Sequence, residues 1–296
     1  MPRLRVTFRA MAAENAMTVD YDDERHARQA IDAAIADVQR IEAKYSRYRD
    51  DSVTSGINRA AGGEPVLVDA ETAALLDYAD RLHSLSRGRF DITSGVLRRA
   101  WDFKRKPARL PDANAIADLL AIVGWQHVSR DADHVRLALH GMQLDFGGIG
   151  KEYAADRAAA ILAQHGIRHA LVNLAGDVRA VNDQADGAPW RVGVQHPRRA
   201  EGEAIAFVEL RDNAIATSGD YERFFEIDGR RYCHVIDART GMPVSAWQSV
   251  SVIAPLATVA GTCATIAMLM EEEAAAFLAR QEVAWLGVDA SGELRR

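Results

Sequence analysis

The chain has 296 residues, of which 48% are hydrophobic and 26% are charged, as in ordinary soluble globular proteins. Its net charge of −6 gives no general basic surface, which argues against nucleic acid as the main partner. No apolar run approaches the roughly 18 residues of a membrane span, and the first residues contain no apolar stretch of signal-peptide length. We therefore expect a cytoplasmic protein, or an exported one whose targeting segment has been removed.

The first predicted elements are a hairpin and a long helix. Two alternating segments, LRVTFRA and AMTVDY, predict the hairpin. Asp22 and Asp23 are candidate caps for the helix, because apolar residues recur every three or four positions from there to Tyr45. Residues 46–63 lack periodicity and are rich in turn formers, so we expect a loop there.

Two more helices and a second hairpin follow. Asp69 can cap a helix that ends at Gly88, since aspartate favours helix starts and glycine helix ends. Another helix is predicted from about Asp112 to Val123. The segment HVSRDADHVRLAL predicts a hairpin around residues 131–133.

The second half of the chain is mostly strands. It begins with a predicted helix from about Lys151 to Gln164, which Gly166 can terminate. Seven apolar segments then predict strands: HALVNL, RAVN, WRVGVQH, AIAFVEL, NAIATS, RRYCHVID and SVSVIA. Helices near residues 256–270 and 272–280 and a closing strand, VAWLGVD, complete the chain.

Helices gather early and strands late, without regular alternation. This order favours an α+β fold, with mixed, largely antiparallel sheets and flanking helices, over a doubly wound parallel sheet. The sequence has no internal repeat and no clear linker, so we expect one unit over residues 1–296, with two lobes. Cys233 and Cys263 form no metal-type pair and are expected to be reduced and buried.

The segment MQLDFGGIGKEYAAD, residues 142–156, joins a predicted strand to a predicted helix. Its three glycines let backbone N–H groups approach a ligand, and a helix N-terminus favours anions. Lys151 lies in the first helical turn, where a cation opposes the helix dipole. The spacing is neither a Walker loop nor G-x-G-x-x-G. One interpretation is therefore a negatively charged ligand, and the other is a tight turn with a solvated lysine.

Two further segments, GRFDITSG and NLAGDV, place Asp91 and Asp177 beside glycines. Either segment alone is consistent with a polar turn. A third segment carries His234 in a predicted strand, a short distance after Ser218 and Tyr221. Histidine can accept the proton of a hydroxyl nucleophile near neutral pH, although an isolated strand histidine is more often a core residue.

Taken together, these segments resemble the FAD:protein FMN transferase family, also called ApbE-like. Seven colinear segments carry the resemblance: SRYRDDSVTSGIN, GRFDITSGVL, LDFGGIGKEYAADRAA, ALVNLAGDVRA, ATSGDYERFF, YCHVIDARTGMPV and VAGTCATIAML. Members of the family cleave FAD with a divalent metal, transfer the FMN half to a threonine or serine hydroxyl of a target protein and release AMP. Some members instead hydrolyse FAD. The resemblance thus implies FAD as substrate, Mg²⁺ as cofactor and an acceptor protein as partner.

The resemblance also implies site residues by position. Those expected to contact FAD are Met11, Tyr48, Arg89, Phe90, Asp91, Asp145, Lys151, His234 and Val235. Lys151 is also expected to offset the pyrophosphate charge, and His234 to take the proton of the acceptor hydroxyl. The backbone carbonyl of Gly148 and the side chain of Thr265 are expected to bind the metal. Two departures are MAAENA at the start and Cys233 in place of the family's serine.

A third departure concerns the metal. The family's metal-binding helix carries an aspartate with a threonine four residues later, a spacing that brings both side chains to one ion. Here Gly261 stands in the place of the aspartate, whereas Thr265 keeps the threonine. We therefore expect a weak metal site that the phosphates of FAD complete, and we expect the helix to tolerate Gly261→Asp.

The missing carboxylate leaves other functions open. One is a FAD-binding protein without transferase activity, such as a flavin carrier or an accessory subunit, and another is a FAD pyrophosphatase. A periplasmic binding module is an unrelated hypothesis, but the sequence contains no two-domain repeat that would support it.

Overall fold

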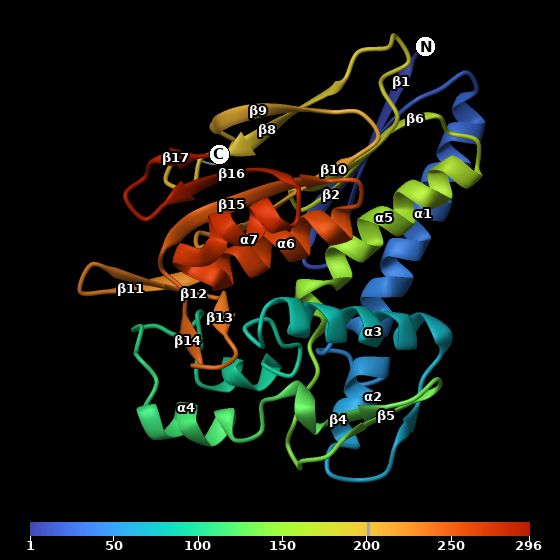
Figure 1. Ribbon diagram of the computed structural model, residues 1–296. Helices are drawn as coiled ribbons and strands as arrows, with labels where there is room; N and C mark the ends of the chain where they lie inside the picture. The colour runs from blue at the N-terminus through green and yellow to red at the C-terminus, as the bar shows by residue number, and fades with distance from the viewer. Residues whose placement is uncertain (200–201) are drawn as a thin grey trace.

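Figure 1 shows the computed structural model, which describes residues 1–199 and 202–296. The α-helices are α1 (Glu24–Tyr45), α2 (Val53–Arg59), α3 (Ala70–Leu85), α4 (Ala113–Leu120), α5 (Gly150–Gln164), α6 (Ala257–Met270) and α7 (Ala274–Arg280). The strands are β1 (Arg3–Ala10), β2 (Ala13–Asp20), β3 (Val66–Leu67), β4 (Val128–Arg130), β5 (His134–Leu137), β6 (His169–Leu174), β7 (Asp177–Val181), β8 (Trp190–Gln195), β9 (Ala204–Leu210), β10 (Ala214–Gly219), β11 (Phe224–Ile227), β12 (Arg230–Cys233), β13 (Ile236–Asp237), β14 (Met242–Pro243), β15 (Trp247–Ala254), β16 (Ala284–Asp289) and β17 (Leu294–Arg295). The predicted α+β class is confirmed.

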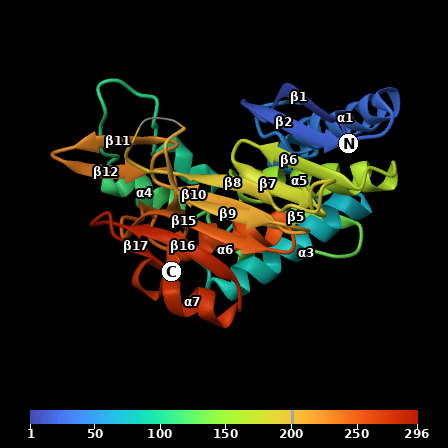
Figure 2. The ribbon, with the colours of Figure 1, turned by 90° about the horizontal axis from the view of Figure 1, so that it is seen from above.

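An eight-stranded sheet runs through the fold in the order β1-β2-β6-β7-β10-β15-β16-β17. All of its neighbouring strands pair antiparallel. Figure 2 looks along the molecule from above and shows β1 at one edge and β16 and β17 at the other. The predicted opening hairpin is present, and its two-residue turn places Met11 and Ala12 at φ 54° and 60°. Positive φ at both positions matches the twist of the strands.

Helices cover one face of this sheet and a strand pair covers the other. On the helical face, α5 contacts β6 and β7, α6 contacts β10 and β15, and α1 packs along α5. On the opposite face, β8 and β9 pack Trp190, Val194 and Leu210 against Val178 and Ile215 of the sheet. The start of α5 and the end of α1 both point toward the part of the molecule that holds α2, α3 and α4 (Figure 1).

A tertiary cap fixes how α5 and α6 lie together. The first turn of α6 has no capping side chain of its own. Instead, Asp156 of α5 accepts hydrogen bonds from the N–H groups of Ala257 and Thr258, both at 2.8 Å, and from the Thr258 hydroxyl at 2.6 Å. These bonds satisfy donors that a helix N-terminus leaves without partners. One turn before Asp156, Glu152 lies against Gly261, so the two helices run antiparallel in a fixed register.

The local helix signals of the sequence are confirmed. The carboxylates of Asp23, Asp69 and Asp112 accept backbone N–H bonds at the starts of α1, α3 and α4. Gly88 and Gly166 follow α3 and α5 with φ of +78°, the left-handed conformation that favours glycine.

The prediction of a loop over residues 46–63 is wrong, because α2 forms within it. Ser52 caps this helix by accepting the N–H of Ser55 at 3.0 Å. Only Thr54 and Ile57 are buried on it. A seven-residue helix with one large buried side chain leaves no apolar period in the sequence.

Cys233 and Cys263 are both free and buried, as predicted. Within the described residues, no helix combines the length and apolar character needed to cross a membrane.

Candidate active site

The glycine turn and the GRFDITSG segment lie directly against each other. The N–H of Asp145 donates to the carbonyl of Ile92 at 2.8 Å. A Cβ at Gly95 would lie only 2.9 Å from the Cβ of Asp145, and a Cβ at Gly148 would lie 3.1 Å from the ring of Phe90. These glycines therefore permit a close approach between two segments that are about 50 residues apart in the sequence.

Two arginines flank Asp145 beside an exposed aromatic ring. The Asp145 carboxylate lies 3.2 Å from Arg47 and 3.6 Å from Arg98. Arg47 also donates to the hydroxyl of Tyr48 at 3.0 Å, and its guanidinium lies 4.9 Å from the centre of that ring. Tyr48 is 77% exposed, so its ring is available to stack on a flat ligand next to two cations.

The carboxylate of Asp91, an expected FAD contact, already accepts hydrogen bonds from other groups of the protein. This buried carboxylate accepts the N–H and the hydroxyl of Thr93, at 2.8 and 2.7 Å, and the N–H of Trp125 at 2.8 Å. Asp91 thus orders the loop that presents Phe90.

Arg89 connects this loop to the segment that carries His234 and Val235. The carbonyl of Arg89 accepts the N–H of Ala238 at 3.2 Å, while its guanidinium pairs with Glu273 at 2.8 Å. Val235 is buried, and its carbonyl accepts the N–H of Val244 at 3.0 Å. The Arg89 carbonyl therefore joins the two segments, whereas the Val235 carbonyl closes the β13–β14 turn within the segment of His234.

Lys151 lies in the first turn of α5 and forms an ion pair with Asp177, which follows the turn between β6 and β7. The Nζ and Oδ2 atoms are 2.8 Å apart. Burial opposes the charge of Lys151, but Asp177 and Glu152 outweigh it and raise the pKa of Lys151 above its usual value. The ammonium group is therefore permanently charged. From the sequence, Asp177 was interpreted only as a turn residue, because its partner lies 26 positions away.

Met11 lies at the same end of the sheet. In the β2–β6 register, Asn15 pairs with Leu174, which brings the β1–β2 turn beside the β6–β7 turn. The Met11 N–H donates to a carboxylate oxygen of Glu42 at 2.6 Å. The structure therefore places Met11 near the turn that supplies Asp177.

His234 lies in a bend between β12 and β13, so the prediction that it lies within a strand is wrong. Strand β12 ends at Cys233, and the His234 N–H donates one more bond in the same register, at 3.0 Å, to the Arg223 carbonyl. Nδ1 of His234 is buried and has no hydrogen-bond partner among residues 1–199 and 202–296. Burial, followed by the charges of Arg223, Arg98 and Lys151, lowers the pKa of His234 to about 4. The imidazole is therefore neutral at pH 7.

The expected metal ligands lie on elements in contact. Gly148 ends the short 3-10 helix η3 (Phe146–Gly148), and Thr265 belongs to α6, which contacts η3. A Cβ at Gly261 would lie 2.5 Å from Cγ of Glu152 and 2.8 Å from its Oε1. The expectation that α6 simply tolerates Gly261→Asp is therefore wrong, because Glu152 already fills that space.

The oxygen atoms around this glycine fit a hard divalent cation. Glu152 is 7% exposed, and its buried Oε2 atom has no hydrogen-bond partner in the part of the chain that the structure describes. Burial, followed by the charge of Asp177, raises the pKa of Glu152 to about 7. Carboxylate, hydroxyl and backbone carbonyl oxygens are the donors that Mg²⁺ binds in proteins. The residues present are therefore compatible with the Mg²⁺ that the resemblance implies.

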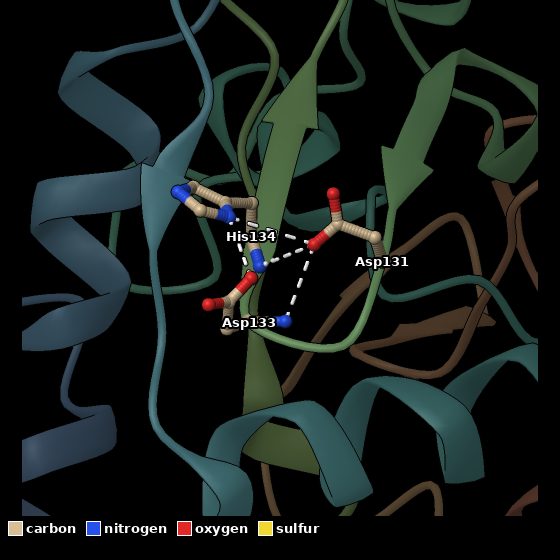
Figure 3. Close-up of side chains that lie close together, drawn as sticks. All are labelled: Asp131, Asp133 and His134. Carbon is tan, nitrogen blue, oxygen red and sulfur yellow. Dashed lines mark hydrogen bonds and ion pairs between the residues drawn. The ribbon is translucent and has the colours of Figure 1, made fainter.

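Among the described residues, one group of three potential metal ligands lies elsewhere, in the turn between β4 and β5. Figure 3 shows its members, Asp131, Asp133 and His134. Asp131 accepts the N–H groups of Asp133 and His134, at 3.2 and 2.8 Å. The two aspartates are exposed. The carboxylate of Asp131 closes the predicted hairpin turn, which accounts for the cluster without an ion.

The same segments relate the chain to known proteins. Residues 7–286 match the model of the ApbE family. A FAD:protein FMN transferase of Treponema pallidum is 35% identical over 277 residues, covering 88% of this chain and 76% of its own length. That of Escherichia coli K12 is 32% identical over 244 residues, covering 80% and 70%. The ApbE protein of Thermotoga maritima superposes with a TM-score of 0.91 at 31% identity, covering 100% and 97% of the two chains. For the flavin transferase ApbE of Vibrio cholerae the TM-score is 0.86 at 27% identity, covering 99% and 96%. The chain therefore belongs to the ApbE family.

Proposed function

We propose that this protein is a Mg²⁺-dependent FAD:protein FMN transferase, which moves the FMN half of FAD to a threonine or serine hydroxyl of an acceptor protein. The observation that carries the proposal is a neutral His234 beside cations: burial, followed by the charges of Arg223, Arg98 and Lys151, lowers its pKa. A proton acceptor among cations is what attack of a hydroxyl on a pyrophosphate requires. The names of the relatives in the same family support the choice of FAD and of a protein acceptor.

The reaction needs one bond to form and one to break. The acceptor hydroxyl oxygen forms a bond to the phosphorus of the FMN half, the bond from that phosphorus to the bridging oxygen breaks, and AMP leaves with this oxygen. The hydroxyl proton passes to the neutral imidazole of His234. Lys151 offsets the charge of the pyrophosphate, as cations do in phosphoryl transfer generally.

The remaining site residues bind and orient FAD. The exposed ring of Tyr48 provides a flat apolar surface for the flavin nucleotide, and Arg47 and Arg98 lie beside it. The ring of Phe90 is buried and packs against the glycine turn at Gly148. A bound Mg²⁺ would neutralise phosphate charge. Gly148, Thr265 and a carboxylate beside Gly261 would hold it.

The alternative of a FAD-binding protein without transferase activity rested on the missing carboxylate at Gly261. A buried carboxylate, that of Glu152, lies directly against this glycine. The alternative therefore loses the feature that favoured it.

The proposal is tested by incubating the protein with FAD, Mg²⁺ and a candidate acceptor that carries an exposed threonine. We expect the acceptor to gain the mass of one covalent FMN unit and AMP to appear in equal amount. Replacing the acceptor threonine by alanine is the control. Release of AMP and free FMN, with no mass gain on any acceptor, would instead indicate the FAD pyrophosphatase.

The protein should bind FAD more tightly than FMN. Lys151 and the open backbone of the glycine turn serve a pyrophosphate, which FMN lacks. Losing a hydrogen bond to a charged group costs about 1.5–3 kcal/mol. We therefore expect FAD to bind roughly 10–100 times more tightly than FMN. Titration by flavin fluorescence, in the absence of acceptor, measures both constants. Equal affinities would show that the glycine turn does not bind the pyrophosphate.

A further inference from the structure

Because Gly261 has no side chain, α6 leaves a space beside this residue, and a side chain of α5 fills it. The place of an α6 side chain is taken by Glu152 of α5, whose Cγ lies 2.5 Å from where a Cβ at position 261 would be. A side chain on α6 and the glutamate on α5 thus exclude each other. The side-chain atoms of either residue would occupy the same position between α5 and α6.

The carboxylate in this space lacks a partner within the described part of the protein. Glu152 is 7% exposed, and its Oε2 atom makes no hydrogen bond. The neighbouring ammonium group of Lys151 pairs with Asp177 instead. The Oδ2 atom of Asp177 is likewise buried and makes no hydrogen bond, although it pairs with Lys151. The ammonium group of Lys151 is therefore shared by two buried carboxylates. A second cation beside Glu152 would offset the cost of burying both charges.

The helix register relates this carboxylate to the expected metal ligands. Asp156 binds the start of α6, and Glu152, four residues earlier on α5, meets Gly261, four residues after Ala257 on α6. On α6, Thr265 follows Gly261 by four residues, and residues four apart lie on one face of a helix. Gly148 lies just before α5, at the end of η3. The contact between η3 and α6 agrees with this register.

We infer that Glu152 supplies the metal-binding carboxylate that the related family carries on α6, so that in this chain the carboxylate has moved to α5. The inference rests on the Mg²⁺ site of the proposed function. The carboxylate group would act together with the Thr265 hydroxyl and the Gly148 carbonyl.

The test measures metal binding directly. Mn²⁺, which also prefers oxygen ligands, is titrated into the purified protein with and without FAD, and the free ion is followed by its electron paramagnetic resonance signal. Glu152→Gln keeps the shape of the side chain and removes its charge. We expect Mn²⁺ affinity to fall by at least about tenfold, as is typical of a disturbed metal site.

The matched control is Glu222→Gln, because this exposed carboxylate also acts on Lys151. It should change the affinity by less than about twofold.

Two further variants test the exchange between helices. Gly261→Asp alone should unfold at a lower temperature, because the new side chain collides with Glu152. Glu152→Ala with Gly261→Asp returns the carboxylate to α6, and Mn²⁺ affinity should recover to within about threefold of the starting protein, a difference below 1 kcal/mol.

The possible results separate the inference from the proposed function. Unchanged affinity in Glu152→Gln, with clear binding in the unaltered protein, would overturn the inference alone. So would a folded double variant, judged by circular dichroism, that fails to recover affinity. If the unaltered protein binds no Mn²⁺ in either condition, the metal dependence in the proposed function falls as well.

Discussion

His234→Ala should lower the rate of FMN transfer by roughly 10²–10⁴-fold, the contribution of a general base. FAD affinity should stay within about threefold, because the imidazole acts on the acceptor hydroxyl and a group acting only in the transition state changes turnover rather than binding. The imidazole can take the proton because its neutral form is stable at pH 7. Single-turnover transfer, followed by the mass of the acceptor, measures the rate.

The neighbouring Cys233→Ser provides a matched control. The thiol of Cys233 faces the carbonyls of Val235 and Val244, and a serine hydroxyl can donate to the same oxygens. We expect this variant to transfer FMN at nearly the rate of the unaltered protein. Wild-type transfer by His234→Ala would show that the histidine is only a packed residue of the bend.

The elements of the fold that sequence reasoning found are those with local signals. Asp23, Asp69 and Asp112 cap helices whose apolar residues repeat on one face, so both signals lie within one segment. The short helix α2 has no such repeat and was missed. The start of α6 could be placed only approximately, because its cap is Asp156, a residue about 100 positions earlier.

In the site, too, sequence reasoning found the signals that lie within one segment and missed the contacts between distant segments. The glycine turn and the segment that carries His234 were found as separate stretches, by their composition and by the family resemblance. Their pairings were not found, since Lys151 with Asp177 and Glu152 with Gly261 are contacts between distant segments. The sequence contained no signal for Glu152, because the helix dipole favours a carboxylate in the first turn of a helix whether or not a cation binds.

Lys151→Met should lower FMN transfer by roughly 10²–10³-fold, the cost of removing one preorganised charge from a transition state. The same change should also destabilise the protein. Asp177 is 2% exposed, and without Lys151 its carboxylate becomes a buried charge that has lost its ion pair. Breaking a buried pair on one side costs about 3–5 kcal/mol. Urea unfolding and single-turnover transfer measure the two effects on the same preparation.

The double variant Lys151→Met with Asp177→Asn separates the two effects. An uncharged amide at position 177 no longer needs the ammonium group, so most of the lost free energy of unfolding should return. Transfer should remain low, because the cation that offsets the pyrophosphate charge is still absent. If transfer recovered together with stability, Lys151 would serve only to neutralise Asp177. In that case Arg98 and Arg223, the other cations that lower the pKa of His234, would have to offset the phosphate charge without it.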